Sequence, residues 1–265
     1  MTQRLNGKVA IVTGATQGIG ADIARALAHE GAQRVFIVGR GLQAGTAVAA
    51  EIGAAATAIE ADITDDQAIE RCVAQALAVN GQIDILVNCA CIYDDAGLAS
   101  SRAQWHATLD VNLVSAAVFT QKVEPHMGRG AVVVNLGSVG GKFGTANRAI
   151  YPASKAALIQ ITRNFAVTLA PRGIRVLSVS PAWTWSPSLE RMARGSRSIA
   201  DRVGGITHPL GRVGDGAEVG RVVAFAASDE ASWITGTDIA VDGGFSSLGP
   251  DQGAPARDWF EGSGG

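Results

Sequence analysis

The segment Lys8–Gly20 reads KVAIVTGATQGIG and joins two patterns that decide the fold. Its first half is an apolar run of strand length, and its second half is a glycine-rich turn that opens a helical pattern. Glycines permit a tight turn and a close approach of the backbone to a pyrophosphate, while the helix offers free N–H groups and a partial positive charge. This order predicts a dinucleotide-binding unit, with an ordinary glycine-rich loop as the alternative.

Segments of strand length alternate with helical patterns along most of the 265 residues. Seven segments are predicted to be strands: Lys8–Thr13, Arg34–Gly39, Ala56–Ala61, Ile83–Asn88, Ala131–Leu136, Ile174–Ser180 and Asp238–Val241. Six are predicted to be helices: Ile19–Glu30, Leu42–Ile52, Asp65–Val79, Ser101–His126, Tyr151–Ala170 and Ala217–Ala227. Such alternation predicts a doubly wound α/β fold, with a parallel sheet, right-handed crossovers and helices on both faces.

The length is compatible with one large α/β domain, which we place at residues 1–245. Residues 184–214 break the alternation and are polar, so we expect them to form a lid over a substrate. Residues 246–265 are rich in Gly and end in Gly-Ser-Gly-Gly, which predicts a partly flexible C-terminal tail.

Composition excludes several classes of protein. The formal net charge of −2 gives no electrostatic reason to bind nucleic acid or an anionic membrane. No apolar run approaches the ~20 residues of a membrane helix, and the N-terminus enters a strand without a signal-peptide pattern. Three cysteines form no disulfide framework and no His/Cys spacing suggests zinc, so we expect a cytoplasmic protein without a metal.

The choice of cofactor depends on the end of the second predicted strand. An acid about 20 residues after the glycine turn would bind the ribose 2′-hydroxyl of NAD. The window Gly31–Ala50 contains no Asp or Glu, but it contains Arg40 directly after the strand. A cation there suits the 2′-phosphate of NADP. We therefore favour NADP, with NAD as the alternative; a solvated surface arginine is the other reading of Arg40.

Tyr151 and Lys155 begin a predicted helix and lie on one of its faces, because they are four residues apart. A free tyrosine has a pKa of about 10 and is a poor base near neutrality, but a nearby ammonium stabilises a phenolate. Ser138 lies just past a predicted strand end, where ligands bind in open α/β sheets. Each residue alone is compatible with a structural role, and together they indicate an acid/base site.

At this point the chain resembles the classical short-chain dehydrogenase/reductases over residues 5–245. The matching elements, in order, are Thr13–Gly20, Asp62, Asn88-Cys89-Ala90-Cys91, Asn112, Ser138, Tyr151, Lys155, Pro181-Ala182 and Val241-Asp242-Gly243-Gly244. The resemblance implies a single-domain Rossmann fold with a seven-stranded parallel sheet in the order 3-2-1-4-5-6-7. It also implies a homotetramer or homodimer.

The resemblance assigns a role to each matching residue. Tyr151 would be the general acid/base, Ser138 would bind the reacting oxygen, Lys155 would bind the nicotinamide ribose, and Asn112 would hold a water of a proton relay. Tyr151 and Lys155 would also contact the cofactor. The other cofactor-binding residues would be Thr13, Gly14, Thr16, Gln17, Gly18, Ile19, Gly20, Arg40, Asp62, Ile63, Asn88, Ala90, Pro181, Thr184 and Ser186.

Two positions depart from the family pattern: Cys91 and Ala182 stand where glycine is usual. Cys91 adds a side chain to the crevice floor. Ala182 predicts either a slightly different backbone or mild strain, since alanine does not adopt a positive φ cheaply. Aromatic residues predict a substrate pocket, although the tryptophans could instead anchor the lid. The predicted substrate residues are Cys91, Tyr93, Ser138, Phe143, Tyr151, Trp183 and Trp185.

The expected reaction is an NADP-linked interconversion of a ketone and a secondary alcohol, with a small carbonyl or alcohol as substrate. Two alternatives stay open: a 3-oxoacyl thioester reductase of the same family, and a non-catalytic dinucleotide-binding regulator. The regulator would not need the Asn112, Ser138, Tyr151 and Lys155 set. Epimerase or dehydratase relatives usually carry a longer substrate domain, which this chain lacks.

Overall fold

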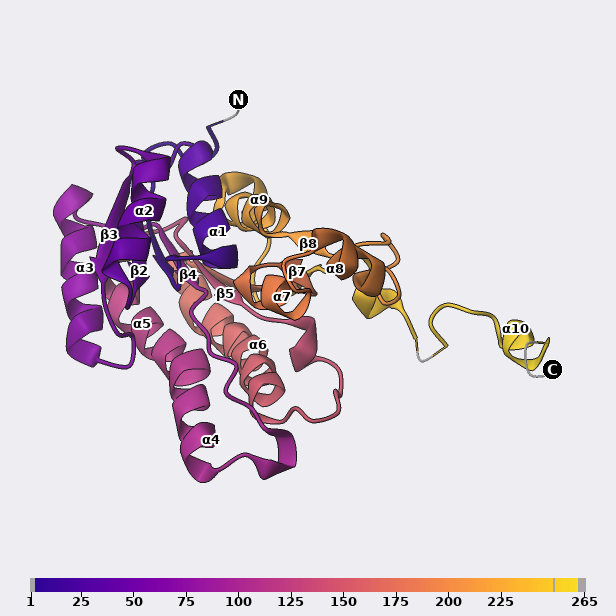
Figure 1. The fold of residues 1–265 in the computed structure, drawn as a ribbon. Coiled ribbons are helices and arrows are strands. Elements are labelled where there is room, and N and C mark those ends of the chain that lie inside the picture. Colours follow the sequence, from indigo (N-terminus) through magenta and orange to yellow (C-terminus); the bar gives the residue numbers. More distant parts are fainter. Residues whose placement is uncertain (1–2, 250, 262–265) are drawn as a thin grey trace.

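The computed structural model describes residues 3–249 and 251–261. Its main sheet has seven parallel strands in the order β3-β2-β1-β4-β5-β6-β9 (Figure 1). This is the predicted order, because β9 is the seventh strand along the chain within this sheet. The strands are β1 (Val9–Thr13), β2 (Arg34–Gly39), β3 (Ala56–Glu60), β4 (Ile85–Asn88), β5 (Val132–Leu136), β6 (Arg175–Pro181) and β9 (Asp238–Val241).

Helices cover both faces of the sheet, and each face has its own apolar layer. Alternate strand residues divide between the layers: Ala10 and Val12 face one, whereas Val9 and Ile11 face the other. The first layer is closed by α1 (Gly18–His29), α2 (Leu42–Ile52) and α9 (Gly216–Ala227). The second is closed by α3 (Asp66–Asn80), α5 (Ser115–Val123) and α6 (Ile150–Leu169). The doubly wound fold is therefore confirmed.

The strand order reverses between β1 and β4, and this reversal positions the site. Strands β2 and β3 follow β1 in one direction, whereas β4, β5, β6 and β9 extend in the other. The register aligns the carboxyl ends of the central strands, with Thr13 opposite Asn88 and Asn88 opposite Asn135. In open α/β sheets, ligands bind beyond the strand ends at such a reversal.

The single helix predicted for Ser101–His126 is wrong in its middle. The structure has α4 (Arg102–Leu109), a π-helical turn over Asp110–Val114, and then α5. In this turn the Ser115 N–H donates to the Asp110 carbonyl, which inserts one extra residue into the helical ladder. Asn112 lies at the centre of the turn, and π-turns inside α-helices frequently mark functional sites.

The segment 184–214 carries four short elements: β7 (Thr184–Trp185), α7 (Pro187–Met192), α8 (Arg197–Gly204) and β8 (Gly214–Asp215). Strands β7 and β8 pair in parallel, so the two ends of the segment lie side by side directly before the start of α9. A last helix, α10 (Ala256–Glu261), lies well away from the body in Figure 1. The predicted lid function and the flexibility of the tail stay predictions.

Two searches of residues 3–249 and 251–261 bear on the wider class of the protein. No helix within these ranges has the length and apolarity needed to cross a membrane. Within the same ranges, no group of three or more His, Cys, Asp or Glu side chains is arranged to hold a metal ion.

Candidate active site

The glycine turn between β1 and α1 packs closely on the neighbouring backbone and leaves the first turn of α1 without a side-chain cap. Gly14 has φ +67°, and a Cβ there would lie 2.6 Å from the Ala90 Cα. A Cβ on Gly20 would run into the Gly14 carbonyl oxygen. Gln17 precedes α1 without a side-chain cap, and the first turn of α1 carries no acidic residue. Its N–H groups and helix dipole are therefore available to an anionic group.

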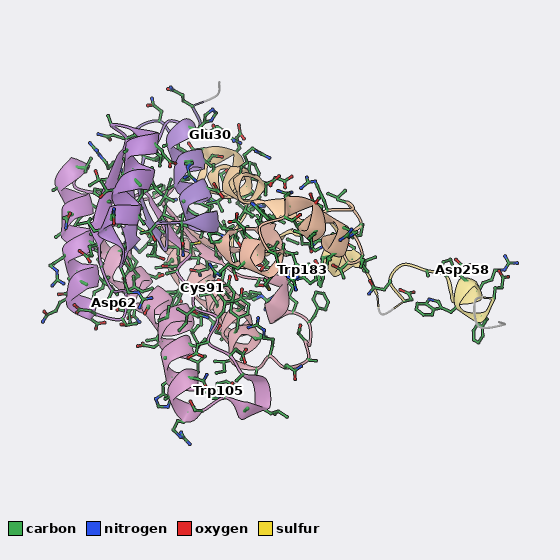
Figure 2. The ribbon with its side chains drawn as sticks, viewed as in Figure 1. Glu30, Asp62, Cys91, Trp105, Trp183 and Asp258 are labelled. Atoms are coloured by element: carbon green, nitrogen blue, oxygen red, sulfur yellow. The ribbon has the colours of Figure 1, made fainter. Side chains whose placement is uncertain are left out.

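A crevice of about 820 Å³ opens at the carboxyl ends of the strands, within the usual range for ligand sites. Figure 2 labels two of its lining residues, Asp62 and Cys91. The structure brings sixteen of the predicted residues to its walls: Gly14, Thr16, Gln17, Gly18, Ile19, Gly20, Arg40, Asp62, Ile63, Ala90, Cys91, Tyr93, Tyr151, Lys155, Pro181 and Ser186.

Arg40 and Asp62 lie on the β2 and β3 side of this crevice. The Asp62 carboxylate accepts hydrogen bonds from the Thr64 N–H at 3.0 Å and the Thr64 hydroxyl at 2.8 Å. These bonds lower the pKa of Asp62, and the Arg40 charge adds to the effect. The wall at this end of the crevice therefore carries the Arg40 cation beside the Asp62 carboxylate, which already accepts hydrogen bonds from Thr64.

Tyr151 and Ser138 both border Gly140. A Cβ built on Gly140 would lie 3.3 Å from the Ser138 Oγ and 3.5 Å from the Tyr151 Cε1, so the two side chains flank the same position. Ser138 caps the short helical turn Val139–Gly141, and its Oγ accepts from the Gly140 N–H at 3.0 Å. The Ser138 hydroxyl proton is therefore free to be donated elsewhere.

Lys155 is buried one helical turn after Tyr151. Its Nζ donates to the Leu136 carbonyl at 2.7 Å and lies 5.8 Å from the centre of the Tyr151 ring. Burial disfavours the charge of Lys155, but charge interactions with the acidic groups of Cys91, Tyr151 and Cys89 outweigh it, and the pKa of Lys155 is raised. Lys155 is therefore a charged ammonium beside Tyr151.

Cys91 and Tyr93 form the part of the wall that faces Tyr151. The rings of Tyr93 and Tyr151 stack with centroids 4.7 Å apart and planes at 30°. Half of Tyr93 is exposed, but its hydroxyl end is enclosed. This burial raises the pKa of Tyr93, and Cys91 and Tyr151 raise it further, so its hydroxyl stays protonated near neutral pH.

Asn112 does not line the crevice; it lies behind the crevice wall. Its Oδ1 accepts from the Ile92 N–H at 2.8 Å, and its Nδ2 donates to the Ile92 carbonyl at 3.0 Å and to the Ser154 Oγ at 3.1 Å. The side chain thus ties the loop after β4 to α6. Its predicted role in holding a relay water stays a prediction.

Thr13 and Asn88 lie beneath the crevice and support it. The Thr13 Oγ1 accepts from the backbone N–H groups of Cys89 and Ala90 at 3.1 and 3.2 Å, which joins the ends of β1 and β4. The Asn88 Nδ2 donates to the Asn135 Oδ1 at 2.8 Å inside the sheet. Both side chains are buried, so their effect on a ligand acts through the backbone that they hold.

The four aromatic side chains predicted to form a substrate pocket lie in different surroundings, and the pocket stays a prediction. Tyr93 stacks on Tyr151, whereas Phe143 packs on Phe245, Trp183 packs on His208, and the rings of Phe245 and His208 are themselves in contact. Trp185 lies under Arg197, whose guanidinium carbon is 5.6 Å from its ring, and packs on a small apolar cluster of the 184–214 segment. These partners of Trp185 lie within residues 184–214, so its contacts hold that segment together, and the predicted anchoring of the lid against the body stays a prediction.

Two further expectations for the segment after β6 differ from the structure. Thr184 is buried, donates to the Ala182 carbonyl at 3.1 Å, and lines a separate cavity of about 330 Å³ with Trp183. The predicted strain at Ala182 is absent. Among the described residues, positive φ values outside glycine occur at Asn147, Arg194 and Gln252.

Asp95 is a residue that the sequence patterns did not indicate, and Arg191 is an arginine of residues 184–214 for which contact with an anionic substrate is the less favoured interpretation. Asp95 binds backbone N–H groups at the start of α6, more than fifty residues along the chain. Arg191, on α7, lines the crevice beside Ser186 and Ser188. No local signal marks Asp95, because its partners are distant in sequence. Arg191 was more typical of a solvated basic face, and only the fold of α7 brings it to the crevice.

Comparisons with known proteins agree with this geometry. A family model described as enoyl-(acyl carrier protein) reductase matches residues 14–246. The chain is 36% identical to a sorbitol dehydrogenase of Cereibacter sphaeroides, covering 91% of this chain and 98% of the relative. It is 37% identical to a 3-oxoacyl-(acyl-carrier-protein) reductase of Thermotoga maritima, with the same coverage. A Brucella melitensis crystal structure, titled short-chain dehydrogenase/reductase and glucose/ribitol dehydrogenase, superposes with a TM-score of 0.86 at 31% identity, covering 92% of this chain and 99% of that one.

Proposed function

The chain belongs to the short-chain dehydrogenase/reductase family of oxidoreductases, and we propose that it interconverts a ketone and a secondary alcohol with NADP, using Tyr151 as the general acid/base. The observation that supports this proposal is that Tyr151 and Lys155 line one crevice with the glycine turn, while Ser138 borders Gly140 beside Tyr151. The dinucleotide and the reacting carbonyl then share one space at the strand ends.

The cradle of the glycine turn supports binding of a dinucleotide. Gly14 and Gly20 let the turn pack closely, because a Cβ at either position would clash with the backbone of Ala90 or Gly14, and the first turn of α1 has uncapped N–H groups that could bind a pyrophosphate. Arg40 would meet the 2′-phosphate, which favours NADP over NAD. Family members use nicotinamide nucleotides, and when bound the cofactor supplies or accepts the hydride.

The protein's own residues would handle the proton. In reduction, the Tyr151 hydroxyl gives its proton to the carbonyl oxygen; in oxidation, the Tyr151 phenolate takes it from the alcohol. The Ser138 hydroxyl donates to the same oxygen and stabilises the charge that develops there. Lys155 holds a positive charge 5.8 Å from the Tyr151 ring and favours the phenolate.

The relatives support two substrate classes. One is a small polyol or cyclic alcohol, because a relative is named a sorbitol dehydrogenase and another, 34% identical, a cis-4-hydroxycyclohexanecarboxylate dehydrogenase of Sinomonas cyclohexanicum. The other is a 3-oxoacyl thioester, after the Thermotoga maritima relative. Cys91 and Tyr93 narrow the crevice next to Tyr151, which favours the small substrate.

A substrate panel tests the proposal. Purified protein is assayed with NADPH and NADH on cyclic ketones, ketoses and a 3-oxoacyl thioester, and with the oxidised cofactors on the matching alcohols. Tyr151→Phe should lower kcat by at least about 10²-fold and leave the Kd for NADPH within about threefold. Tyr93→Phe is the matched control, because it removes the hydroxyl of the stacked ring, and it should keep kcat within about tenfold.

Each outcome of the panel decides something. Turnover that survives Tyr151→Phe would contradict the acid/base assignment. Tight NADPH binding without turnover of any ketone would favour the non-catalytic regulator.

A further inference from the structure

Helix α6 begins with a cap that comes from elsewhere in the chain. Tyr151 is the second residue of α6, and Ala149, at the capping position, has no side chain that can accept a hydrogen bond. Asp95, in the loop after β4, replaces it. The two Asp95 carboxylate oxygens accept from the Ala149 N–H at 3.0 and 2.9 Å, and Oδ2 also accepts from the Tyr151 N–H at 2.9 Å.

The other end of the Tyr151 residue is held from the same side of the crevice. The Ser154 hydroxyl donates to the Tyr151 carbonyl at 2.7 Å and accepts from the Asn112 Nδ2 at 3.1 Å. Asn112 in turn binds both backbone groups of Ile92. Both backbone polar groups of Tyr151 are therefore connected to the short loop segment that runs from Ile92 to Asp95.

The charge of Asp95 suits this position. Burial opposes ionisation of Asp95, but the N–H groups of Gly97, Tyr151 and Ala149 outweigh it, and the pKa of Asp95 is lowered. A carboxylate also interacts favourably with the positive end of a helix, and hydrogen bonds to a charged acceptor are stronger than neutral ones. The loop therefore binds the helix with a charged group rather than a neutral one.

We propose that Asp95 is a positioning residue: it fixes the first turn of α6 against the loop after β4, and so sets where the Tyr151 hydroxyl lies relative to the substrate and to Ser138. The same loop carries Cys91 and Tyr93, and the Tyr93 ring stacks on Tyr151. The crevice wall and the reacting side chain thus move as one body. This inference rests on the proposed role of Tyr151.

Kinetics of three variants test the inference. Asp95→Ala removes all the bonds, Asp95→Asn keeps one acceptor oxygen but no charge, and Asp94→Ala is the matched control. Asp94 is the preceding acidic residue, and its carboxylate accepts from the Gln104 side chain instead of from α6. We expect D95A to lower kcat at least about tenfold, because small misplacement of a reacting group is costly. D95N should lower kcat about threefold, and D94A should match wild type.

Comparing kcat with KM and with the Kd for NADPH distinguishes a misplaced Tyr151 from a general distortion of the crevice. In D95A the KM for the carbonyl substrate and the Kd for NADPH should stay within about threefold of wild type. Unchanged kcat in D95A would overturn the inference, as would an equal loss in D94A. A fall in kcat matched by an equal loss of NADPH binding would also overturn it, since that would indicate a distorted crevice.

Hydrogen exchange of the Tyr151 amide gives a readout that needs no turnover. First-turn N–H groups have no partner within their own helix, so protection of this amide reports the Asp95 bond directly. Exchange should be at least about tenfold faster in D95A and unchanged in D94A. If wild type reduces no ketone, the proposed function fails while this measurement still decides the Asp95 contact. If D95A does not fold, D95N takes its place in both measurements. A D95N variant with the same Tyr151 amide exchange rate and the same kcat as wild type would overturn the inference.

Discussion

Tyr151 and Lys155 illustrate what single residues disclose before a structure is known. Their spacing of one helical turn predicts a shared face, and the structure has Lys155 buried 5.8 Å from the Tyr151 ring. Asp95 discloses nothing in the sequence, because an acid in a loop has many ordinary uses and its partners are fifty residues away. Spacing along one helix is local information, whereas a cap supplied from another segment exists only after folding.

Arg40 carries the prediction about the cofactor. It lines the crevice near Asp62, where the 2′-phosphate of NADP would approach. Arg40→Asp should shift the ratio of kcat/KM for NADPH and NADH by at least about tenfold towards NADH, because it replaces a charge-assisted bond with repulsion. The control is Arg71→Ser, an exposed arginine on α3 that pairs with Asp65. An unchanged ratio in R40D would show that Arg40 is a solvated residue.

At the level of elements, the strands are the most predictable part, and the helix through Asn112 the least. Val132-Val133-Val134 is a continuous apolar run, and such a run fits a strand covered on both faces. The π-turn could not be predicted, because the apolar periodicity does not mark an inserted residue; in the structure the Asn112 side chain at its centre binds the backbone of Ile92. The packing partner of Trp185 could not be predicted either, because Trp185 on β7 and Arg197 on α8 are brought into contact by the tertiary structure.

The start of α9 gives a prediction about acid stability. Glu218 accepts from the Asp215 N–H at 2.8 Å in a capping box, and it pairs with Arg212 through bonds of 2.9 and 2.7 Å. The Arg212 bonds, followed by the Asp215 N–H, lower the pKa of Glu218 from 4.5 to about 2. A carboxyl with a lower pKa in the folded state stabilises the protein above its unfolded pKa and loses this effect as the pH falls.

The stabilisation by Glu218 is therefore complete above about pH 4.5 and lost as the pH approaches about 2. Glu218→Gln should lower Tm at pH 6 and converge with wild type near pH 2.5, measured by calorimetry. The effect should be no more than about 1 kcal/mol, because the ion pair is partly exposed. Glu60→Gln, an exposed carboxylate on β3, is the control. A Tm difference that persists unchanged at pH 2.5 would contradict the assignment.

At the scale of the whole molecule, some large apolar side chains are not buried in either apolar layer and are exposed on the surface. Val167 on α6 is 77% exposed, and Trp233, shortly before the edge strand β9, is 99% exposed. The resemblance to the family implies an oligomer joined through the helices near Ser101–His126 and Tyr151–Ala170 and through the C-terminal strand, and α6 and β9 are two of these three segments. Exposed apolar groups next to a sheet edge are the kind of surface that a second copy covers.

We therefore expect a homotetramer, or a homodimer, in solution. Light scattering should give a mass of four or two chains, and Trp233→Asp with Val167→Asp should reduce it, because charges would be buried at the contact. Trp259→Asp, on α10, is the matched control and should leave the mass unchanged. A wild-type mass equal to one chain would refute the expectation.

The position of Cys91 on the crevice wall has a practical consequence for chemical probes. Of the three cysteines in the sequence, Cys72 and Cys89 have pKa values raised by burial to about 11 and about 12, so both stay protonated and unreactive near neutral pH. Cys91 faces the space where a carbonyl substrate would lie. Cys89 also lines the crevice, but burial keeps it protonated, so a weak electrophile attached to a crevice ligand should label Cys91 in preference to Cys89.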